Sequence, residues 1–311
     1  MNILLWHVHG SWTTSFVQGK HRYLVPVNAG RDEWGRGRAR TFDWPGTVEE
    51  VDAGALRPGD VDAIVLQRPG ELARVAHLTA PKIYVEHNTP KGDVPDSRHT
   101  VADRDDLVIA HVTHFNELFW DTGGTRTTVI EHGIVEPAAR WTGELERFAV
   151  VTNEPVRRHR VTGTDLMPRF AAVAPLDVYG MGVAGLDLDR VTAYDDPPQT
   201  RMHEAIARRR AYLHLCRWTS LGLSLIEAMQ IGMPVLALAT TEAVAAVPPD
   251  AGVLSTRVGT LVEAAQWLIE DPDAARRLGA RARQVALARY GLDRFLADWD
   301  RLLEEETCAS R

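Results

Sequence analysis

The chain has 311 residues, enough for two domains of ordinary size with a core each. Its net charge of −7 argues against a nucleic-acid partner, because a phosphate backbone selects basic surfaces. Two cysteines are too few for a structural zinc site or a disulfide framework, which is typical of a reducing compartment. No apolar run approaches the ~20 residues of a membrane-spanning helix. We therefore expect a cytoplasmic protein.

Short aliphatic runs alternate with helical patterns along the chain, which indicates parallel sheets covered by helices. Strands are predicted near 2–8, 23–27, 62–67, 82–87, 107–112, 127–131, 147–152, 176–180, 190–194, 211–215 and 234–238. Helices are predicted near 69–78, 113–122, 163–174, 199–210, 221–231, 258–270, 272–289 and 292–306. The segment 28–46 is predicted to be a long ordered loop. The polar stretch 136–143 reads as a linker, so two Rossmann-like domains facing each other across a cleft are expected.

Two features of the first half follow predicted strands. The first strand leads through Gly10 and Ser11 into a possible helix, and a glycine turn there lets the backbone approach a ligand closely. His87 ends the strand 82–87, and ligands of open α/β sheets bind at the carboxyl ends of strands. His87 is therefore a candidate polar contact; a histidine satisfied within the core is the alternative.

Three arginines open the second half. Arg157, Arg158 and Arg160 follow the strand 147–152. Their guanidinium groups could neutralise a leaving diphosphate, because arginine binds phosphate oxygens through paired N–H groups. A solvated basic loop is the alternative.

The segment 217–235 is the most informative part of the sequence. Thr219 or Ser220 is predicted to cap a helix that ends before Gly232, and the free N–H groups at its start suit a phosphate. Glu227 would lie about 10 Å along the axis from that end. Its neighbours are apolar, so its carboxylate needs donors, and a ribose diol supplies two. A nucleoside diphosphate is therefore predicted; a core helix whose Glu pairs with an arginine is the alternative.

This segment resembles the signature of glycosyltransferase family 4, retaining enzymes of the GT-B fold with a Glu-x7-Glu pattern. The family pattern is E-G-F-G-L-x-x-x-E-A-M-A-x-G-x-P-V, and the residues that match it are Gly222, Leu223, Glu227, Ala228, Met229, Gly232, Pro234 and Val235. Residues 178–182 resemble the family's strand-and-glycine element, and 130–134 resemble the motif that closes its first domain. The helix 295–306 resembles the tail that packs back toward the N-terminal domain.

The resemblance implies an α/β protein of the GT-B fold. Residues 1–140 would form an acceptor-side domain, 141–290 a nucleotide-sugar-binding domain, and 291–311 a helix that packs back on the first. The implied reaction moves a sugar from a nucleotide-sugar donor to a small-molecule, glycan or lipid-linked acceptor, with retention of configuration. No metal and no cofactor besides the donor substrate are expected.

The resemblance also implies roles for individual residues. His87, Arg157 and Arg158 would be catalytic. The donor would be bound by Gly10, Ser11, Arg160, Gly182, Thr219, Ser220, Leu221, Gly222, Leu223 and Glu227. Thr219 stands where the family carries its first Glu, so a neutral hydroxyl replaces a carboxylate expected on a donor-sugar hydroxyl. A GT-B sugar-nucleotide epimerase and a catalytically silent nucleotide-sugar binder remain as alternatives.

Overall fold

The computed structural model describes residues 1–309, which form two compact units. Unit 1 combines Met1–Val135 with the chain from Leu292 onward, and unit 2 is Glu136–Gly291. The predicted divisions lie after residues 140 and 290. Each unit is described by itself.

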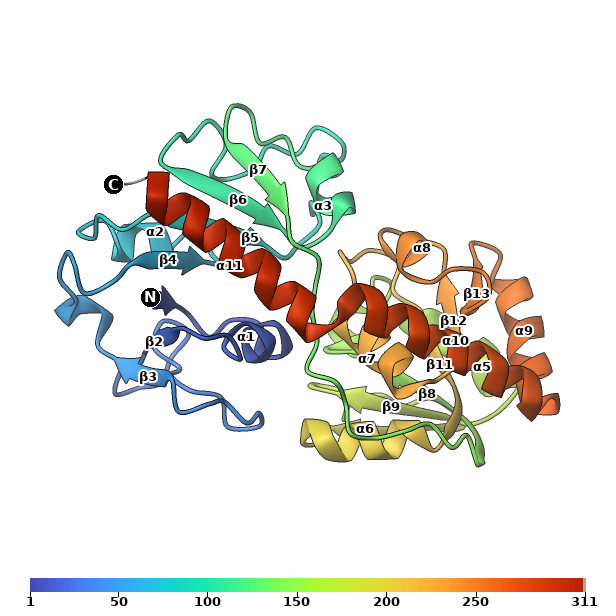
Figure 1. Cartoon of the computed structure of the whole chain (residues 1–311). Helices are drawn as coiled ribbons and strands as arrows, with labels where there is room; N and C mark the ends of the chain where they lie inside the picture. Colours follow the sequence, from blue (N-terminus) through green and yellow to red (C-terminus); the bar gives the residue numbers. More distant parts are fainter. Residues whose placement is uncertain (310–311) are drawn as a thin grey trace. The chain divides into compact units, whose positions relative to one another are not determined.

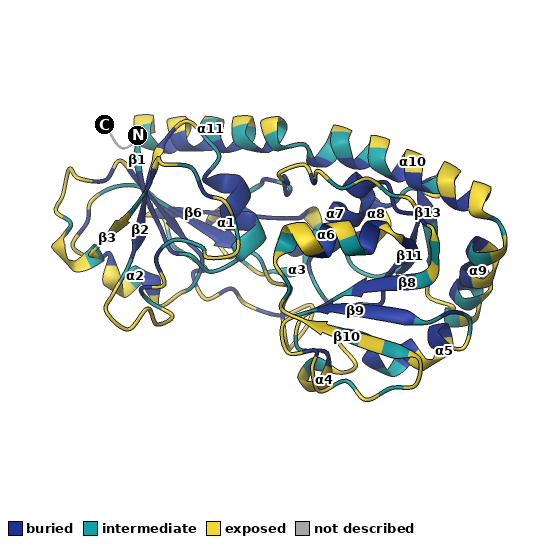
Figure 2. Cartoon of the chain, turned by 90° about the horizontal axis from the view of Figure 1, so that it is seen from below, coloured by how far each residue is buried: buried dark blue, intermediate teal, exposed yellow. Residues whose placement is uncertain are grey.

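Unit 1 is built on a seven-stranded sheet in which every neighbouring pair is parallel (Figure 1). The strands are β1 (Asn2–Leu5), β2 (Arg22–Pro26), β3 (Val48–Val51), β4 (Ala63–Leu66), β5 (Lys82–Glu86), β6 (Leu107–His111) and β7 (Arg126–Val129), in the order β3-β2-β1-β4-β5-β6-β7. The helices are α1 (Gly10–Phe16), η1 (Ala53–Ala55), α2 (Glu71–Arg74) and α3 (His114–Phe119). The central strands are buried along their length (Figure 2), which explains their continuous aliphatic sequences.

Unit 2 has a six-stranded parallel sheet in the order β10-β9-β8-β11-β12-β13. Its strands are β8 (Leu145–Val151), β9 (Leu176–Gly180), β10 (Val191–Asp195), β11 (Arg209–His214), β12 (Val235–Leu238) and β13 (Gly252–Ser255). Its helices are α4 (Pro155–Arg158), η2 (Thr164–Leu166), α5 (Met167–Ala171), α6 (Gln199–Ala207), α7 (Leu223–Ile231), α8 (Ala243–Ala246), α9 (Val258–Glu270) and α10 (Pro272–Tyr290). This strand order is that of doubly wound Rossmann folds, whose ligands bind at the carboxyl ends of the strands.

The last helix, α11 (Leu292–Ala309), belongs to unit 1. Trp299 contacts Trp12 and Phe16 of α1, with ring centroids 5.6 and 5.0 Å apart. Phe295 covers Gly133 so closely that a Cβ added there would lie 2.1 Å from the Cβ of Phe295. Only glycine therefore allows this approach, which accounts for one residue of the motif at 130–134.

The predicted elements differ from the structure at the sheet edges. The edge strands β3 and β13 are absent from the prediction, because Val48–Val51 has two glutamates at its centre and Gly252–Ser255 begins with glycine and ends with serine. The four-residue helices α4 and α8 are too short to show a helical period. The expected long loop 28–46 contains no regular helix or strand.

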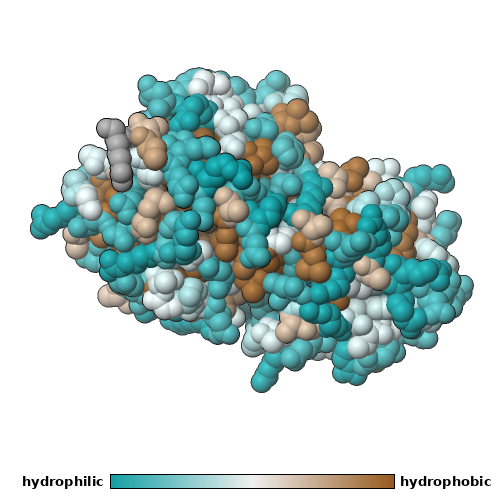
Figure 3. All heavy atoms as spheres, in the orientation of Figure 1, coloured by the Kyte–Doolittle hydropathy of each residue, from teal (hydrophilic) through white to brown (hydrophobic). Residues whose placement is uncertain are grey.

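No helix among the described residues is long and apolar enough to cross a membrane. The surface seen in Figure 3 is mostly hydrophilic, and its hydrophobic residues show in small separate groups. The large apolar side chains exposed on the described part of the chain are likewise scattered along the sequence, from Val94 to Trp267.

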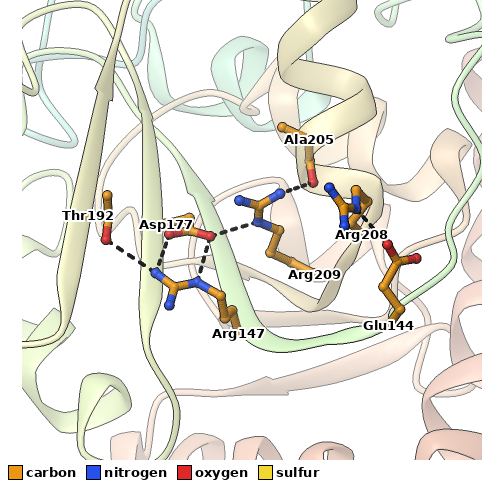
Figure 4. Close-up of polar contacts among 7 residues, drawn as sticks. All are labelled: Glu144, Arg147, Asp177, Thr192, Ala205, Arg208 and Arg209. Carbon is orange, nitrogen blue, oxygen red and sulfur yellow. Dashed lines mark hydrogen bonds and ion pairs between the residues drawn. The ribbon is translucent and has the colours of Figure 1, made fainter.

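A fully buried carboxylate joins three strands of unit 2 (Figure 4). Asp177 of β9 accepts hydrogen bonds from Arg147 of β8, at 2.8 and 2.5 Å, and from Arg209 of β11, at 2.7 Å. Arg209 is itself buried and also donates to the carbonyl oxygen of Ala205. Both carboxylate oxygens are thus paired with guanidinium groups, as a buried charge requires.

We expect Asp177→Asn to lower the free energy of unfolding of unit 2 by about 3 kcal/mol, because it leaves the buried Arg209 without its counter-charge. Urea denaturation measures the change. The matched control is Glu144→Gln, which breaks the exposed ion pair with Arg208 and should change stability little. Equal effects of the two substitutions would contradict the structural role of Asp177.

Candidate functional site

Helix α7 begins at the carboxyl edge of the unit 2 sheet, later than the sequence predicts. Its N-cap is Gly222, with no capping side chain, so the predicted caps Thr219 and Ser220 are wrong. The segment 219–221 instead leads into the helix as irregular backbone. The helix ends at Gly232 as predicted.

Gly222 lies against the ring of His214, the last residue of β11. A Cβ added to Gly222 would lie 2.7 Å from the Cε1 of His214, so only glycine fits. Burial lowers the pKa of His214 to about 4, and the ring is neutral near neutral pH. The start of α7 therefore packs on an uncharged ring, and its free N–H groups supply the positive potential.

Glu227 lies five residues after the N-cap, which is about 7.5 Å along the axis and shorter than predicted. The residue is 2% exposed. Its Oε1 accepts a hydrogen bond from the Nε2 of Gln199, at 3.0 Å, and its Oε2 accepts one from the Nε2 of His203, at 3.1 Å. The partners expected for a structural Glu were arginines; the structure supplies an amide and an imidazole from α6 instead.

The three candidate arginines have different surroundings. Arg157 pairs with Glu154 at 3.3 Å and Arg160 pairs with Asp165 at 3.2 Å, and both side chains are more than 70% exposed. Arg158 is half-buried and has no carboxylate partner among residues 1–309. Its charge lowers the pKa of the nearby Cys216 thiol, against the larger opposing effect of burial. Of the three arginines, Arg158 is therefore the one whose charge is not paired with a carboxylate among residues 1–309.

Arg217 links the segment 157–160 to the irregular segment that leads into α7. Its guanidinium donates to the carbonyl oxygen of Arg160, at 2.6 Å, and to both carboxylate oxygens of Asp165, at 2.6 and 2.8 Å. Its backbone N–H donates to Val161 at 2.8 Å. The structure thus brings Arg157, Arg158 and Arg160 beside the segment that leads into α7.

The remaining candidates of unit 2 lie at the same edge of the sheet. Gly182 follows β9, and a Cβ there would lie 3.1 Å from the carboxylate of Glu154. Ser220 and Leu221 are buried, whereas Thr219 and Leu223 are partly exposed. Thr219, Leu223 and the exposed Gly182 are therefore the members of this group that offer surface to a ligand.

In unit 1, the structure brings His87 together with the start of α1. The rings of His87 and His9 lie 4.0 Å apart, and His9 is followed directly by Gly10 and Ser11, the first two residues of α1. Burial lowers the pKa of His9 to about 4 and that of His87 well below its ordinary value. Both rings are therefore neutral near pH 7.

Gln67 fixes which nitrogen of His87 carries the proton. The Nε2 of Gln67 donates to the carbonyl oxygen of Trp6 at 2.7 Å, so its Oε1 faces the Nε2 of His87 at 3.0 Å. Because Oε1 can only accept, the Nε2 of His87 donates, and its Nδ1 is left as an acceptor. His87 can thus accept a hydrogen bond from a substrate hydroxyl.

Two further histidines of unit 1 are buried without full hydrogen bonding among residues 1–309. His111 lacks a partner on both ring nitrogens, and His132 lacks one on Nδ1. Burial lowers the pKa of each to about 3. No group of three His, Cys, Asp or Glu residues in the described chain is arranged to hold a metal ion.

The ring of Trp12 is not accessible to a ligand. It is fully buried and packs on Phe16 and Trp299, since α11 covers it. Trp120 is partly exposed and donates its indole N–H to the carbonyl oxygen of Asn88 at 2.8 Å.

Sequence reasoning missed the partners of the candidate residues. Gln67, Gln199, His203 and Arg217 each hold a candidate side chain or loop, yet none belongs to a recognised motif. A usable signal existed for two of them: Gln199 and His203 are four residues apart within a predicted helix, so they share one of its faces.

Comparisons with known proteins agree with this architecture. Residues 186–285 match the model of the family described as glycosyl transferases group 1. That segment contains α6, α7 and Glu227. No relative with a curated sequence matches the chain.

Several solved structures share the fold across almost the whole chain. A sucrose-phosphate synthase from Thermosynechococcus elongatus superposes with a TM-score of 0.74 at 15% identity, covering 99% of this chain and 100% of that one. Alr3699/HepE from Anabaena in complex with UDP-glucose gives 0.74 at 15% identity, covering 98% and 100%. The fold is GT-B. AviGT4, a glycosyltransferase involved in avilamycin A biosynthesis, gives 0.66 at 14% identity, covering 99% and 98%.

We expect the stability of this GT-B protein to fall as pH drops below about 6.5. The folded-state pKa values of His111 and His132, about 3, lie below the ordinary 6.5. Between these pH values each histidine is protonated in the unfolded chain and neutral in the folded chain. The free energy of unfolding should therefore fall by roughly 1.4 kcal/mol per pH unit for each such histidine, down to about pH 3.

Urea denaturation at pH 7, 6 and 5 measures this slope. His111→Leu removes one of the histidines with a lowered pKa without adding a charge, and it should flatten the slope below pH 6.5. His114, which is exposed, supplies the control substitution His114→Leu. An unchanged slope in His111→Leu would contradict the assignment.

Proposed function

We propose that the chain is a glycosyltransferase of the family 4 type, which moves a sugar from a nucleoside-diphosphate donor to an acceptor hydroxyl with retention of configuration. The observation that carries the proposal is a buried carboxylate, Glu227, one and a half turns from the open start of α7, in the segment that matches the family model. An anion site beside a carboxylate that accepts hydrogen bonds from hydroxyl groups suits a phosphate and its ribose.

The diphosphate would bind at the start of α7. Gly222 offers no capping side chain, so the N–H groups of Leu223 and Ser224 could donate to phosphate oxygens. Arg158 adds a charged donor that no carboxylate neutralises among residues 1–309. Arg157 and Arg160 could reach the ligand only by leaving Glu154 and Asp165. We therefore expect them to contribute less than Arg158 to binding the diphosphate.

The ribose would bind beside Glu227. Side chains of a helix tilt toward its N-terminus, so this carboxylate leans toward the proposed phosphate position. A ribose has two neighbouring hydroxyl groups that donate to carboxylate oxygens, and hydrogen bonds to a charged group are worth about 1.5–3 kcal/mol. Glu227 therefore selects a ribonucleotide.

The chemistry would rest on stabilising negative charge. As the bond between the sugar and the diphosphate breaks, charge grows on the leaving phosphate, and the start of α7 and Arg158 would stabilise that charge. The leaving phosphate can itself accept the acceptor's proton. No metal is needed in this scheme, because fixed N–H groups and a guanidinium take the role of the cation. His87, with its Nδ1 left as an acceptor, would hold a substrate hydroxyl on unit 1.

The test is to incubate the protein with UDP- and GDP-sugars in excess EDTA. We expect a thermal shift with the cognate nucleotide and slow release of the free sugar with its anomeric configuration retained. A changed sugar on an intact nucleotide would identify an epimerase. Binding with neither reaction would identify a silent binder, which the neutral Thr219 makes a real alternative. Loss of all binding in EDTA, restored by Mg²⁺, would overturn the metal-free scheme.

The same assay with Glu227→Gln tests the ribose contact. We expect nucleoside-diphosphate affinity to fall about 10- to 100-fold, because a neutral amide replaces a charged acceptor. Glu204→Gln makes the same chemical change at an exposed position on α6 and should have no effect. Unchanged binding together with reduced stability would make Glu227 structural.

The residue at position 219 should influence the choice of donor sugar. Thr219 is partly exposed and neutral where the family pattern has Glu, so it holds a sugar hydroxyl weakly or accommodates a donor that lacks it. Thr219→Glu should shift relative kcat/KM toward a hexose donor over its deoxy analogue by about ten- to a hundredfold. Competition between the two donors measures the shift, and equal losses for both would show that position 219 does not contact the sugar.

A further inference from the structure

Two side chains of α6 hold the carboxylate of Glu227 from one side. Gln199 and His203 are four residues apart, so they lie on the same face of α6, and this face packs against α7. Each donates to a different oxygen of Glu227, at 3.0 and 3.1 Å. The pair therefore fixes both the position and the rotation of the carboxylate plane.

The location of Gln199 follows from the chain before it. Pro197 and Pro198 follow β10, and Pro198 is the N-cap of α6, so Gln199 is the first residue of the helix. Gln199 is partly exposed, whereas His203, one turn later, is buried. His203 thus approaches Glu227 from the protein interior, and Gln199 approaches it from the edge of the site.

The hydrogen bonds from α6 leave acceptor capacity on Glu227. A carboxylate has about four lone-pair positions, and the two donors use one on each oxygen. One position per oxygen is left, which is what two neighbouring hydroxyl groups require. Asp177 is different, because three N–H groups of two arginines occupy its oxygens.

We infer that Gln199 and His203 are positioning residues that set the ribose selectivity of Glu227. The inference rests on the proposed function. By holding the carboxylate in one orientation, they direct its remaining lone pairs at both ribose hydroxyls. Without either donor the carboxylate rotates to satisfy itself, and the selectivity for a ribose over a 2′-deoxyribose falls.

The experiment measures dissociation constants for UDP and GDP and for their 2′-deoxy counterparts by calorimetry. The wild type should bind the ribonucleotide at least about tenfold more tightly than its 2′-deoxy form. Gln199→Leu and His203→Leu should each reduce that ratio to about two- or threefold, mainly by weakening the ribonucleotide. His203→Gln keeps an N–H donor and should restore most of the ratio. Glu204→Leu on the exposed side of α6 is the control and should leave the ratio unchanged.

The outcomes separate this inference from the proposed function. If the wild type distinguishes ribose and the variants keep the full ratio, the inference is overturned while the proposed function stands. Equal weakening of both nucleotides with a lower melting temperature would make the pair structural and would also overturn it. A wild type that binds neither nucleotide pair would overturn both. Gln199→Leu is at a partly exposed helix start, so it reports even if His203→Leu does not fold.

Discussion

A carboxylate removed from water needs hydrogen-bond donors, and this requirement organises the sheet and the helices of unit 2. Asp177 meets it with two arginines from the neighbouring strands, and the three strands are tied together as a result. Glu227 meets it with an amide and an imidazole from α6, and two helices are tied together instead. The first carboxylate is neutralised by two guanidinium groups and stabilises the fold. The second accepts one hydrogen bond on each oxygen and retains acceptor capacity, which is what a binding site needs.

Each unit gathers its polar candidates at one edge because all its strands are parallel. His9 and His87 follow β1 and β5, and Arg158 and His214 follow or end β8 and β11. The opposite edge of each sheet carries no candidate. In unit 1 the neutral histidines suit the hydroxyl groups of a ligand. In unit 2 the arginine and the start of a helix suit a phosphate.

The sequence was sufficient for most of the fold and for part of the site. Buried strands such as β4 and β12 are aliphatic along their whole length, whereas β3, with glutamates at its centre, looks like a loop until it is paired at the sheet edge. The start of α7 could not be located from side chains, because Thr219 and Ser220 are both good caps, whereas the observed N-cap is Gly222, which has no side chain. Likewise, the order of Arg157, Arg158 and Arg160 in the sequence does not tell which of them pairs with a carboxylate. Glu154 and Asp165 contact their arginine partners only once the loop has folded.

The return of α11 to unit 1 also makes the order of synthesis matter. Unit 2 is continuous in sequence and has its own core, so it can fold as soon as its last residues leave the ribosome. Unit 1 begins first and is completed last, because Trp12 and Phe16 lack Trp299 until residues 292–309 have been translated. Until then a face of α1 with two large aromatic rings is open to water. A nascent or truncated chain that stops before α11 therefore exposes a hydrophobic aromatic surface. Chaperones and proteases recognise such surfaces.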